Sequence, residues 1–158
     1  MMQVSIRSAD KSDIKELVEI EKSSFVSGDG PLSSKSFRYH IERSNILFIA
    51  SVNINDKCVA AGYALVLPRK NSMRLYSIAV NPAYRGKGVA HELLKEVMHC
   101  AAKRKVASVY LEVRPDNEAA ILLYRKFGFC KTAELSDYYG EGSHGIRMIV
   151  SLQAISNN

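Results

Sequence analysis

A short basic turn between an apolar run and a helical pattern carries the first chemistry in this sequence. The apolar run ends at Val80, and the turn contains Arg85, Gly86, Lys87 and Gly88. Glycines allow positive φ angles and close approach of the backbone to a ligand, and the two basic side chains add full positive charges. The helix that follows begins with backbone N–H groups that have no intrahelical partner. Together these are the parts of a site that binds phosphate groups.

Two common phosphate-binding loops do not match this turn. A Walker loop needs a glycine five residues before Gly86, where Asn81 stands, and a dinucleotide-binding fingerprint needs a glycine where His91 stands. An ordinary surface turn with two incidental charges therefore stays open on these residues alone.

A second segment makes the pattern specific. Leu111 to Arg114 is followed by Asn117 and Tyr124, and a Tyr138-Tyr139 pair precedes the last β-prone run. Combined with the basic turn, these residues resemble the GNAT acetyltransferase superfamily and, within it, the ribosomal-protein-alanine N-acetyltransferases. Arg85-x-x-Gly88-x-Ala90 is similar to the pyrophosphate loop of the superfamily. The resemblance is strong over residues 73–130, fair over 131–150 and weak before 70.

The resemblance implies that acetyl-CoA is the cosubstrate and that no prosthetic group or metal is needed. Its pantetheine arm would run along the strand that ends at Val80, in a cleft opened where that strand splays from the strand over 106–113. The residues implied to bind acetyl-CoA are Ile78, Ala79, Val80, Arg85, Gly86, Lys87, Gly88, Val89, Ala90 and Asn117.

The resemblance also implies that Glu112 is the general base and Tyr124 the general acid, with Tyr138 and Tyr139 on the acceptor side. The chemistry agrees, because acyl transfer to an amine needs a group that removes the ammonium proton and one that protonates the leaving thiolate. A phenol with a reference pKa of ~10 can still protonate a thiolate whose reference pKa is ~8.5. Backbone N–H groups near Val80 would polarise the thioester carbonyl.

Each of these residues also has a structural interpretation. Tyr124 lies on the apolar face of its helix and could be a core residue. Glu112 could pair with Arg114 or face solvent, Asn117 could only cap a helix, and the two loop tyrosines could be plain aromatics. Their joint occurrence at the family's spacing favours the functional roles, above all for Glu112 and Tyr124.

The resemblance implies that the acceptor is a primary amine, most closely the N-terminal α-amino group of a protein such as a ribosomal protein. The alanine-acetylating branch has a Pro-Trp-Ser element between its first two helices, whereas this chain has Pro31-Leu32-Ser33 and no tryptophan. A small amine, an amino acid or a lysine side chain therefore stays open as the acceptor.

The pattern of apolar residues predicts the elements that position these groups. It favours one α/β (mixed α+β) domain over residues 1–158, with a central, mixed and mostly antiparallel sheet of about seven strands and four helices. Strands are expected near 3–7, 46–52, 58–67, 73–80, 106–113, 129–135 and 146–152. Helices are expected from 12 to 23, after Ser33, over 89–104 and from 117 to Gly128, with flexible loops over 26–33 and 137–142.

Composition excludes several other classes of protein. The chain has 158 residues, of which 47% are hydrophobic and 24% charged, as in ordinary globular domains. It has no apolar run of ~18 residues and begins without the apolar block of a signal peptide, which places it in the cytoplasm. Cys58, Cys100 and Cys130 are expected to be small buried residues without disulfides or metal.

The charge is uneven along the chain. The formal net charge is +6, and residues 67–105 contain nine basic side chains against Glu92 and Glu96. A basic segment favours an anionic partner, so a non-catalytic module that binds RNA or the ribosome is the alternative from another class. Nucleic acid and membrane are not expected as partners of the acetyltransferase, and monomer and dimer stay open.

Overall fold

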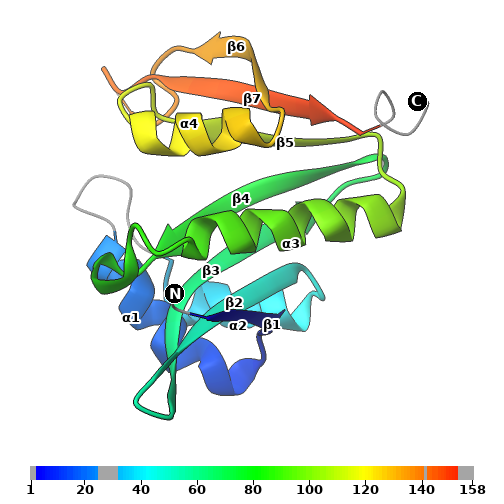
Figure 1. Cartoon of the computed structure of the whole chain (residues 1–158). Helices are drawn as coiled ribbons and strands as arrows, with labels where there is room; N and C mark the ends of the chain where they lie inside the picture. Colours follow the sequence, from blue (N-terminus) through cyan, green and yellow to red (C-terminus); the bar gives the residue numbers. More distant parts are fainter. Residues whose placement is uncertain (1–2, 25–31, 141, 153–158) are drawn as a thin grey trace. The chain divides into compact units, whose positions relative to one another are not determined.

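The computed structural model describes residues 3–24, 32–140 and 142–152. Within them, seven strands follow the order β1-β2-β3-β4-β5-β7-β6, accompanied by four α-helices (Figure 1). The strands are β1 Val4–Ser8, β2 Ile46–Ile54, β3 Lys57–Pro68, β4 Ser72–Val80, β5 Ser108–Val113, β6 Cys130–Leu135 and β7 Gly145–Ser151. The helices are α1 Ile14–Ser24, α2 Ser34–Glu42, α3 Val89–Arg104 and α4 Glu118–Lys126, with 3-10 turns η1 Lys11–Asp13 and η2 Pro82–Tyr84. The predicted mixed, mostly antiparallel sheet with four helices is confirmed.

Most of the loop predicted over 26–33, and one residue of that over 137–142, lie outside the described residues. The residues group into two compact units. The first contains Met1–Leu67 and Ser77–Val97, and the second contains Pro68–Tyr76 and Met98–Asn158, so β4 and α3 contribute to both. The single acetyltransferase domain expected over residues 1–158 stays a prediction.

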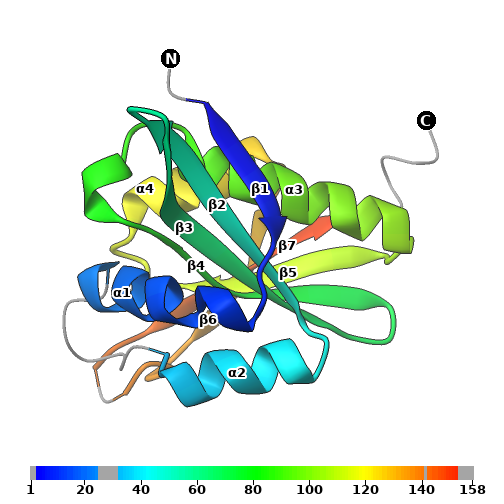
Figure 2. The same cartoon turned by 90° about the horizontal axis from the view of Figure 1, so that it is seen from below.

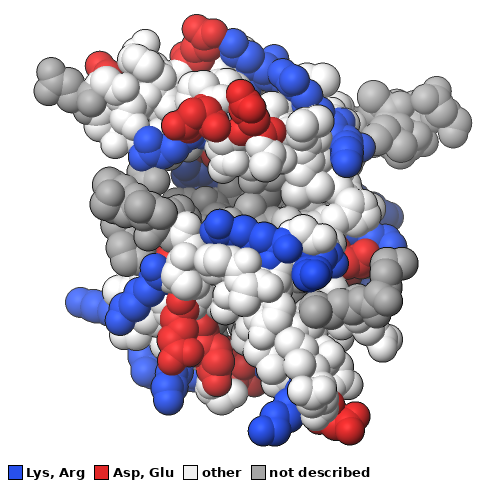
Figure 3. All heavy atoms as spheres, turned by 60° about the vertical axis from the view of Figure 1, so that its left-hand side comes forward, with Lys and Arg blue, Asp and Glu red and all other residues white. Residues whose placement is uncertain are grey.

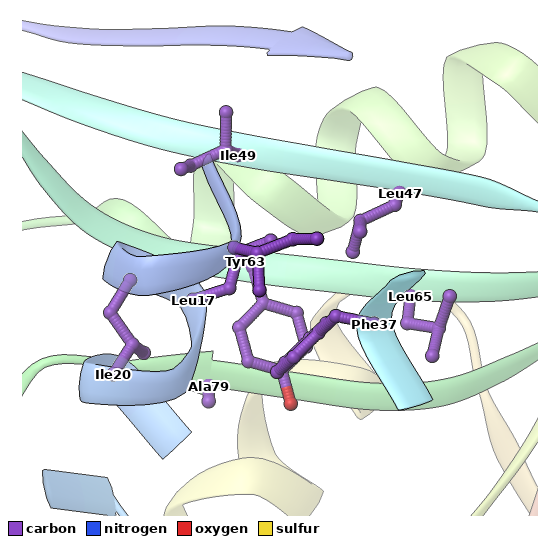
Figure 4. Packing of buried hydrophobic residues seen from close by; sticks show 9 residues of the cluster. Leu17, Ile20, Phe37, Leu47, Ile49, Tyr63, Leu65 and Ala79 are labelled. Carbon is purple, nitrogen blue, oxygen red and sulfur yellow. The ribbon is translucent and has the colours of Figure 1, made fainter. Parts of the chain in front are cut away.

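The core of the first unit forms on one face of β2 and β3. Those strands pair antiparallel through a tight turn at Asn55 and Asp56, whose φ angles are positive. Tyr63 of β3 is fully buried, and the ring of Phe37 from α2 meets it edge-on at 5.3 Å between centroids. Leu17 from α1 joins the same cluster (Figure 4). Helices α1 and α2 therefore cover this face (Figure 2).

The opposite face of β3 receives the start of α3. Gly62 precedes Tyr63 and so faces the other way. A Cβ atom on Gly62 would lie 2.7 Å from the carbonyl oxygen of Ala79, 3.2 Å from Val89 and 3.3 Å from Leu93. Glycine at this position lets α3 and the end of β4 approach β3 closely.

Replacing Gly62 with alanine is expected to destabilise the protein by about 1–3 kcal/mol, the usual cost of overpacking. The clash involves a backbone oxygen at 2.7 Å, which cannot turn away as a flexible side chain can. Urea unfolding followed by circular dichroism measures the change. A midpoint equal to that of the wild-type protein would show that β3 and the end of β4 can move apart at Gly62 without cost.

A β-bulge next to Gly62 fixes the turn that follows β4. Ala50 pairs with Gly62 while Ser51 pairs with Ala60, so Ala61 is the extra residue. The carbonyl oxygen of Ala61 accepts a hydrogen bond from the backbone N–H of Asn81 at 2.8 Å. The side chain of Asn81 in turn accepts from Ala83 N–H at 2.9 Å. The bulge thus anchors the first residues of the basic turn.

The second unit contains the antiparallel strands β5, β7 and β6, and α4 lies alongside them (Figure 1). The first residues of β4 pair parallel to β5, with Arg74 opposite Tyr110. Tyr124 of α4 is buried against Phe129 at 5.8 Å between ring centroids. Gly128, with a φ of 94°, ends α4 as predicted.

The prediction that the cysteines are buried is wrong. Cys58 and Cys130 are exposed and Cys100 is half-buried. Cys58 lies at the start of β3 and Cys130 at the start of β6, an edge strand that is mostly exposed. Among the described residues, no helix is both long and apolar enough to cross a membrane.

Candidate active site

The basic turn of the first unit lies at the surface, directly before α3. Arg85, Gly86, Lys87 and Gly88 are all exposed, and the φ angles of the two glycines are 74° and 86°. A Cβ atom on either glycine would meet nothing within 4 Å, so glycine is favoured there by its backbone conformation and not by space. Exposed cations and a helix N-terminus fit the pyrophosphate of acetyl-CoA.

The helix after the turn is held in the core of the first unit. Val89 is buried, and the first turn of α3 closes with a hydrogen bond from Glu92 N–H to the Gly88 carbonyl at 3.0 Å. The first backbone N–H groups of an α-helix have no carbonyl acceptor within the helix, so they can donate hydrogen bonds to other groups. Ala90 is half-buried beside them.

The end of β4 supplies the other residues predicted to bind acetyl-CoA. Ala79 is buried in the core cluster, and Ile78 and Val80 are half-buried. The carbonyl oxygen of Val80 accepts a hydrogen bond from the Ser24 hydroxyl at 3.1 Å. The predicted set over residues 78–90 is thus a strand end, a 3-10 turn and a helix start, and its binding role stays a prediction.

Glu112 in the second unit is held by two donors on one oxygen. Val113 and the other odd-numbered positions of β5 are buried on one face, and Glu112 points to the other. Its Oε1 accepts from the Arg74 guanidinium at 2.7 Å and from the Tyr138 hydroxyl at 3.2 Å. Its side chain is only 4% exposed. The ion-pair partners of Glu112 are therefore Arg74 and, at 4.0 Å, Arg147, and not Arg114, and Glu112 does not face open solvent.

The second oxygen of Glu112 has a different environment. Oε2 is buried, and within the described part of the chain no donor makes a hydrogen bond to it. Arg147 Nε lies 4.0 Å away and is likewise buried without a hydrogen bond among these residues. Buried carboxylate oxygens normally have a hydrogen-bond donor, and Oε2 has none among these residues. The role of Glu112 as the general base stays a prediction.

In the loop before β7, the side chains of Tyr138 and Tyr139 pack against each other. Their rings meet edge-on at 4.9 Å between centroids, and the guanidinium of Arg114 lies 4.7 Å above the Tyr139 ring. Arg114 also donates to the Ser143 hydroxyl at 2.6 Å. Tyr138 is 41% exposed, and partial burial and the nearby charge of Glu112 raise the pKa of its hydroxyl. Tyr138 therefore stays protonated and can donate to Glu112.

Tyr124 is deeply buried, in agreement with the interpretation that it is a core residue on the apolar face of its helix. Burial, with a smaller contribution from Tyr139, raises the pKa of its hydroxyl well above the usual range. A neutral phenol keeps a proton to give at physiological pH, although a higher pKa makes it a weaker acid. Its role as the general acid stays a prediction.

Asn117 is the N-cap of α4, which confirms the prediction that it caps a helix. Its side-chain oxygen accepts from Ala120 N–H at 3.3 Å. Contact with the pantetheine arm stays a prediction. No group of three or more His, Cys, Asp or Glu side chains able to hold a metal occurs among the residues described here.

No sequence motif indicates Arg74 and Arg147, which flank Glu112. They lie 38 residues before and 35 residues after it in the chain. The one available signal was that Arg74 is a charge between the apolar residues Met73 and Leu75. A charged residue within an otherwise apolar strand indicates an ion-pair partner on a neighbouring strand.

Comparison with known proteins gives one family. The model of the acetyltransferase (GNAT) family matches residues 14–129. An N-alpha-acetyltransferase, RimI, of Mycobacterium tuberculosis is 31% identical over 86% of this chain and 84% of its own length. An uncharacterized protein of Mycobacterium leprae is 33% identical over 81% of this chain, which spans only 35% of that relative.

One solved structure has a similar fold over nearly the whole length of this chain. It is the ribosomal-protein-S18-alanine N-acetyltransferase of Escherichia coli, with a TM-score of 0.82, 28% identity and coverage of 95% of this chain and 94% of that one. The predicted fold and the predicted class of enzyme, an acetyltransferase, are thereby confirmed. The chain belongs to the acetyltransferase (GNAT) family.

Proposed function

We propose that this protein transfers the acetyl group of acetyl-CoA directly to the α-amino group of a protein N-terminus, such as that of a ribosomal protein. The observation that carries the proposal is Glu112, a buried carboxylate with one oxygen bound by donors and the other unoccupied by any donor in the described residues. The names of the M. tuberculosis relative and of the E. coli structure support the α-amino acceptor.

Glu112 and Tyr124 divide the proton transfers. Glu112 accepts, through a water and at Oε2, a proton from the acceptor's ammonium group, which leaves a neutral amine. The amine nitrogen forms the new C–N bond as the C–S bond of the thioester breaks, and this nitrogen must then lose its second proton, which returns to the Tyr124 phenolate once Tyr124 has protonated the thiolate. Tyr124 then donates its proton to the thiolate, and an amide and free CoA are the products. Acetyl-CoA supplies the activated acetyl group, and residues 78–90 and Asn117 would hold it.

Tyr138 and Tyr139 line the acceptor side in this proposal. Tyr138 combines an exposed ring with a hydroxyl that binds Glu112, so an acceptor that contacts the ring lies near the base. The cytoplasmic location expected from the sequence stays part of the proposal.

Arg85→Ala is expected to weaken acetyl-CoA binding by about 1–3 kcal/mol, the cost of losing a charged hydrogen bond. Calorimetric titration of the protein with acetyl-CoA measures it. Arg104→Ala is the matched control, because it removes an equal charge from the exposed last turn of α3 and should leave the affinity unchanged. Equal affinities for wild type and Arg85→Ala would remove this residue from the pyrophosphate site.

The basic segment over residues 67–105 supports a second function, binding of RNA without catalysis. Figure 3 shows acidic side chains between the basic ones on the face it draws, so that face is not uniformly basic. RNA binding would weaken steeply with salt and persist in Glu112→Gln. The acetyltransferase proposal predicts little affinity for RNA.

Release of free CoA tests the proposal directly. A thiol reagent should report turnover with a lysine-free peptide that begins with alanine, and none with the same peptide acetylated at its N-terminus. The protein could instead turn over a small amine or a lysine side chain and not the free N-terminus. That result would favour the other class of acceptor, which the absence of tryptophan leaves open.

A further inference from the structure

Arg74, Glu112 and Tyr138 form a closed set of contacts in the second unit. The Nη2 atom of Arg74 lies 2.7 Å from Glu112 Oε1 and 2.8 Å from the Tyr138 hydroxyl oxygen. The Tyr138 hydroxyl donates to the same Glu112 oxygen at 3.2 Å. Three elements, β4, β5 and the loop before β7, therefore meet at one carboxylate oxygen.

The strand register explains how Arg74 reaches Glu112. Arg74 pairs with Tyr110 in the parallel ladder, and Glu112 lies two residues further on the same face of β5. The long arginine side chain spans this diagonal. Its guanidinium is also 5.3 Å from the centre of the Tyr76 ring, and its side chain is only 23% exposed. Packing against the ring limits the rotation of the guanidinium.

We infer that Arg74 is a positioning residue for the transfer reaction, because with Tyr138 it fixes Oε1 of Glu112 and so presents Oε2 as the oxygen that accepts the proton. This inference rests on the proposed role of Glu112 as the base. A carboxylate bound through one oxygen cannot rotate freely, so its second oxygen keeps one direction. Arg147, 4.0 Å from Oε2, is the other charged group facing Glu112 among the described residues.

Arginine suits this role better than lysine. A planar guanidinium donates in fixed directions, whereas an ammonium is a single point of charge on a flexible stem. Nη2 of Arg74 contacts both the carboxylate and the phenol oxygen. A lysine at this position would keep the charge and one contact, so it should restore part of the function.

The test compares Arg74→Met, Arg74→Lys and the control Arg69→Met, all with the lysine-free peptide that begins with alanine. Arg69 is an exposed arginine just before β4. Arg74→Met is expected to lower kcat by about 10–100-fold, as misplacement of a reacting group does. Arg74→Lys should recover a large part of kcat, Arg69→Met should match wild type, and the affinity for acetyl-CoA should stay unchanged in all three.

A double-mutant cycle separates positioning from general damage. If Arg74 acts through Glu112, Arg74→Met should have little further effect on kcat in a Glu112→Gln background. If Arg74→Met does not fold, Arg74→Gln replaces it, because glutamine is neutral but still donates a hydrogen bond. Circular dichroism and thermal unfolding verify that each variant is folded.

The outcomes distinguish this inference from the proposed function. Wild-type turnover in Glu112→Gln would overturn the base and the inference that depends on it. Loss of turnover in Glu112→Gln together with wild-type kcat in Arg74→Met would overturn the inference alone. Equal, additive losses in both backgrounds would show that Arg74 acts on the fold or on another group, which also overturns it.

Discussion

Glu112→Gln is expected to lower kcat by about 10²–10⁴-fold, the usual contribution of a general base. Glutamine keeps the shape of the side chain and can still accept from Arg74 and Tyr138 through its oxygen. It has no lone pair basic enough to remove the ammonium proton. Steady-state release of CoA with a peptide acceptor, measured from neutral to mildly acidic pH, gives the ratio of kcat values.

The control for this change is Glu134→Gln. Glu134 is an exposed glutamate of β6 that pairs with Lys131, so its replacement removes the same charge away from Glu112. Its kcat should equal that of the wild-type protein. If Glu112→Gln turned over as fast as Glu134→Gln, proton removal would occur elsewhere, and Glu112 would be a structural partner of Arg74.

Tyr124→Phe is expected to slow the transfer by about 10²-fold, the lower end of the range for a general acid. The lower end applies because burial raises the pKa of the Tyr124 hydroxyl, which reduces the driving force for proton donation. The ring stays, so its packing against Phe129 is retained. Single-turnover measurements of acetyl transfer isolate this chemical step from product release.

Thermal unfolding distinguishes the two roles of Tyr124. As the general acid, Tyr124→Phe should lose rate with little change in Tm. An unchanged rate with a large fall in Tm would show that the hydroxyl is a structural group of the buried core. The buried position of Tyr124 agrees with either role, so the rate and the Tm must be measured together.

Local signals explain why much of the fold could be predicted. Apolar residues at helical spacing predict a helix over 89–104, and α3 spans those same residues. Asn117 and Gly128 have the expected cap and stop conformations at the two ends of α4. Such features depend on a few neighbouring residues, so the sequence alone contains them.

The parts that could not be predicted depend on contacts between distant residues. Arg74, Glu112 and Tyr138 come from three separate segments, and only the strand register brings them together. Gly62 is a local signal of the bulge at Ala61, but the hydrogen bond from Asn81 to the bulge joins residues far apart in the chain. The apolar neighbours of Cys58 predict that it is buried, but it lies at the exposed start of β3, beside the turn from β2.

The most direct test of the central claim is to map where the acetyl group goes. Two peptide pools are incubated with acetyl-CoA and the protein, one with free N-termini and no lysine, the other with blocked N-termini and one lysine. Intact-mass and fragment analysis then locate the acetyl group, with Glu112→Gln as the inactive control. Acetylation of α-amino groups in the first pool alone is the predicted result. Acetylation of lysine in the second pool alone would contradict it and would assign the protein to the lysine-acetylating class.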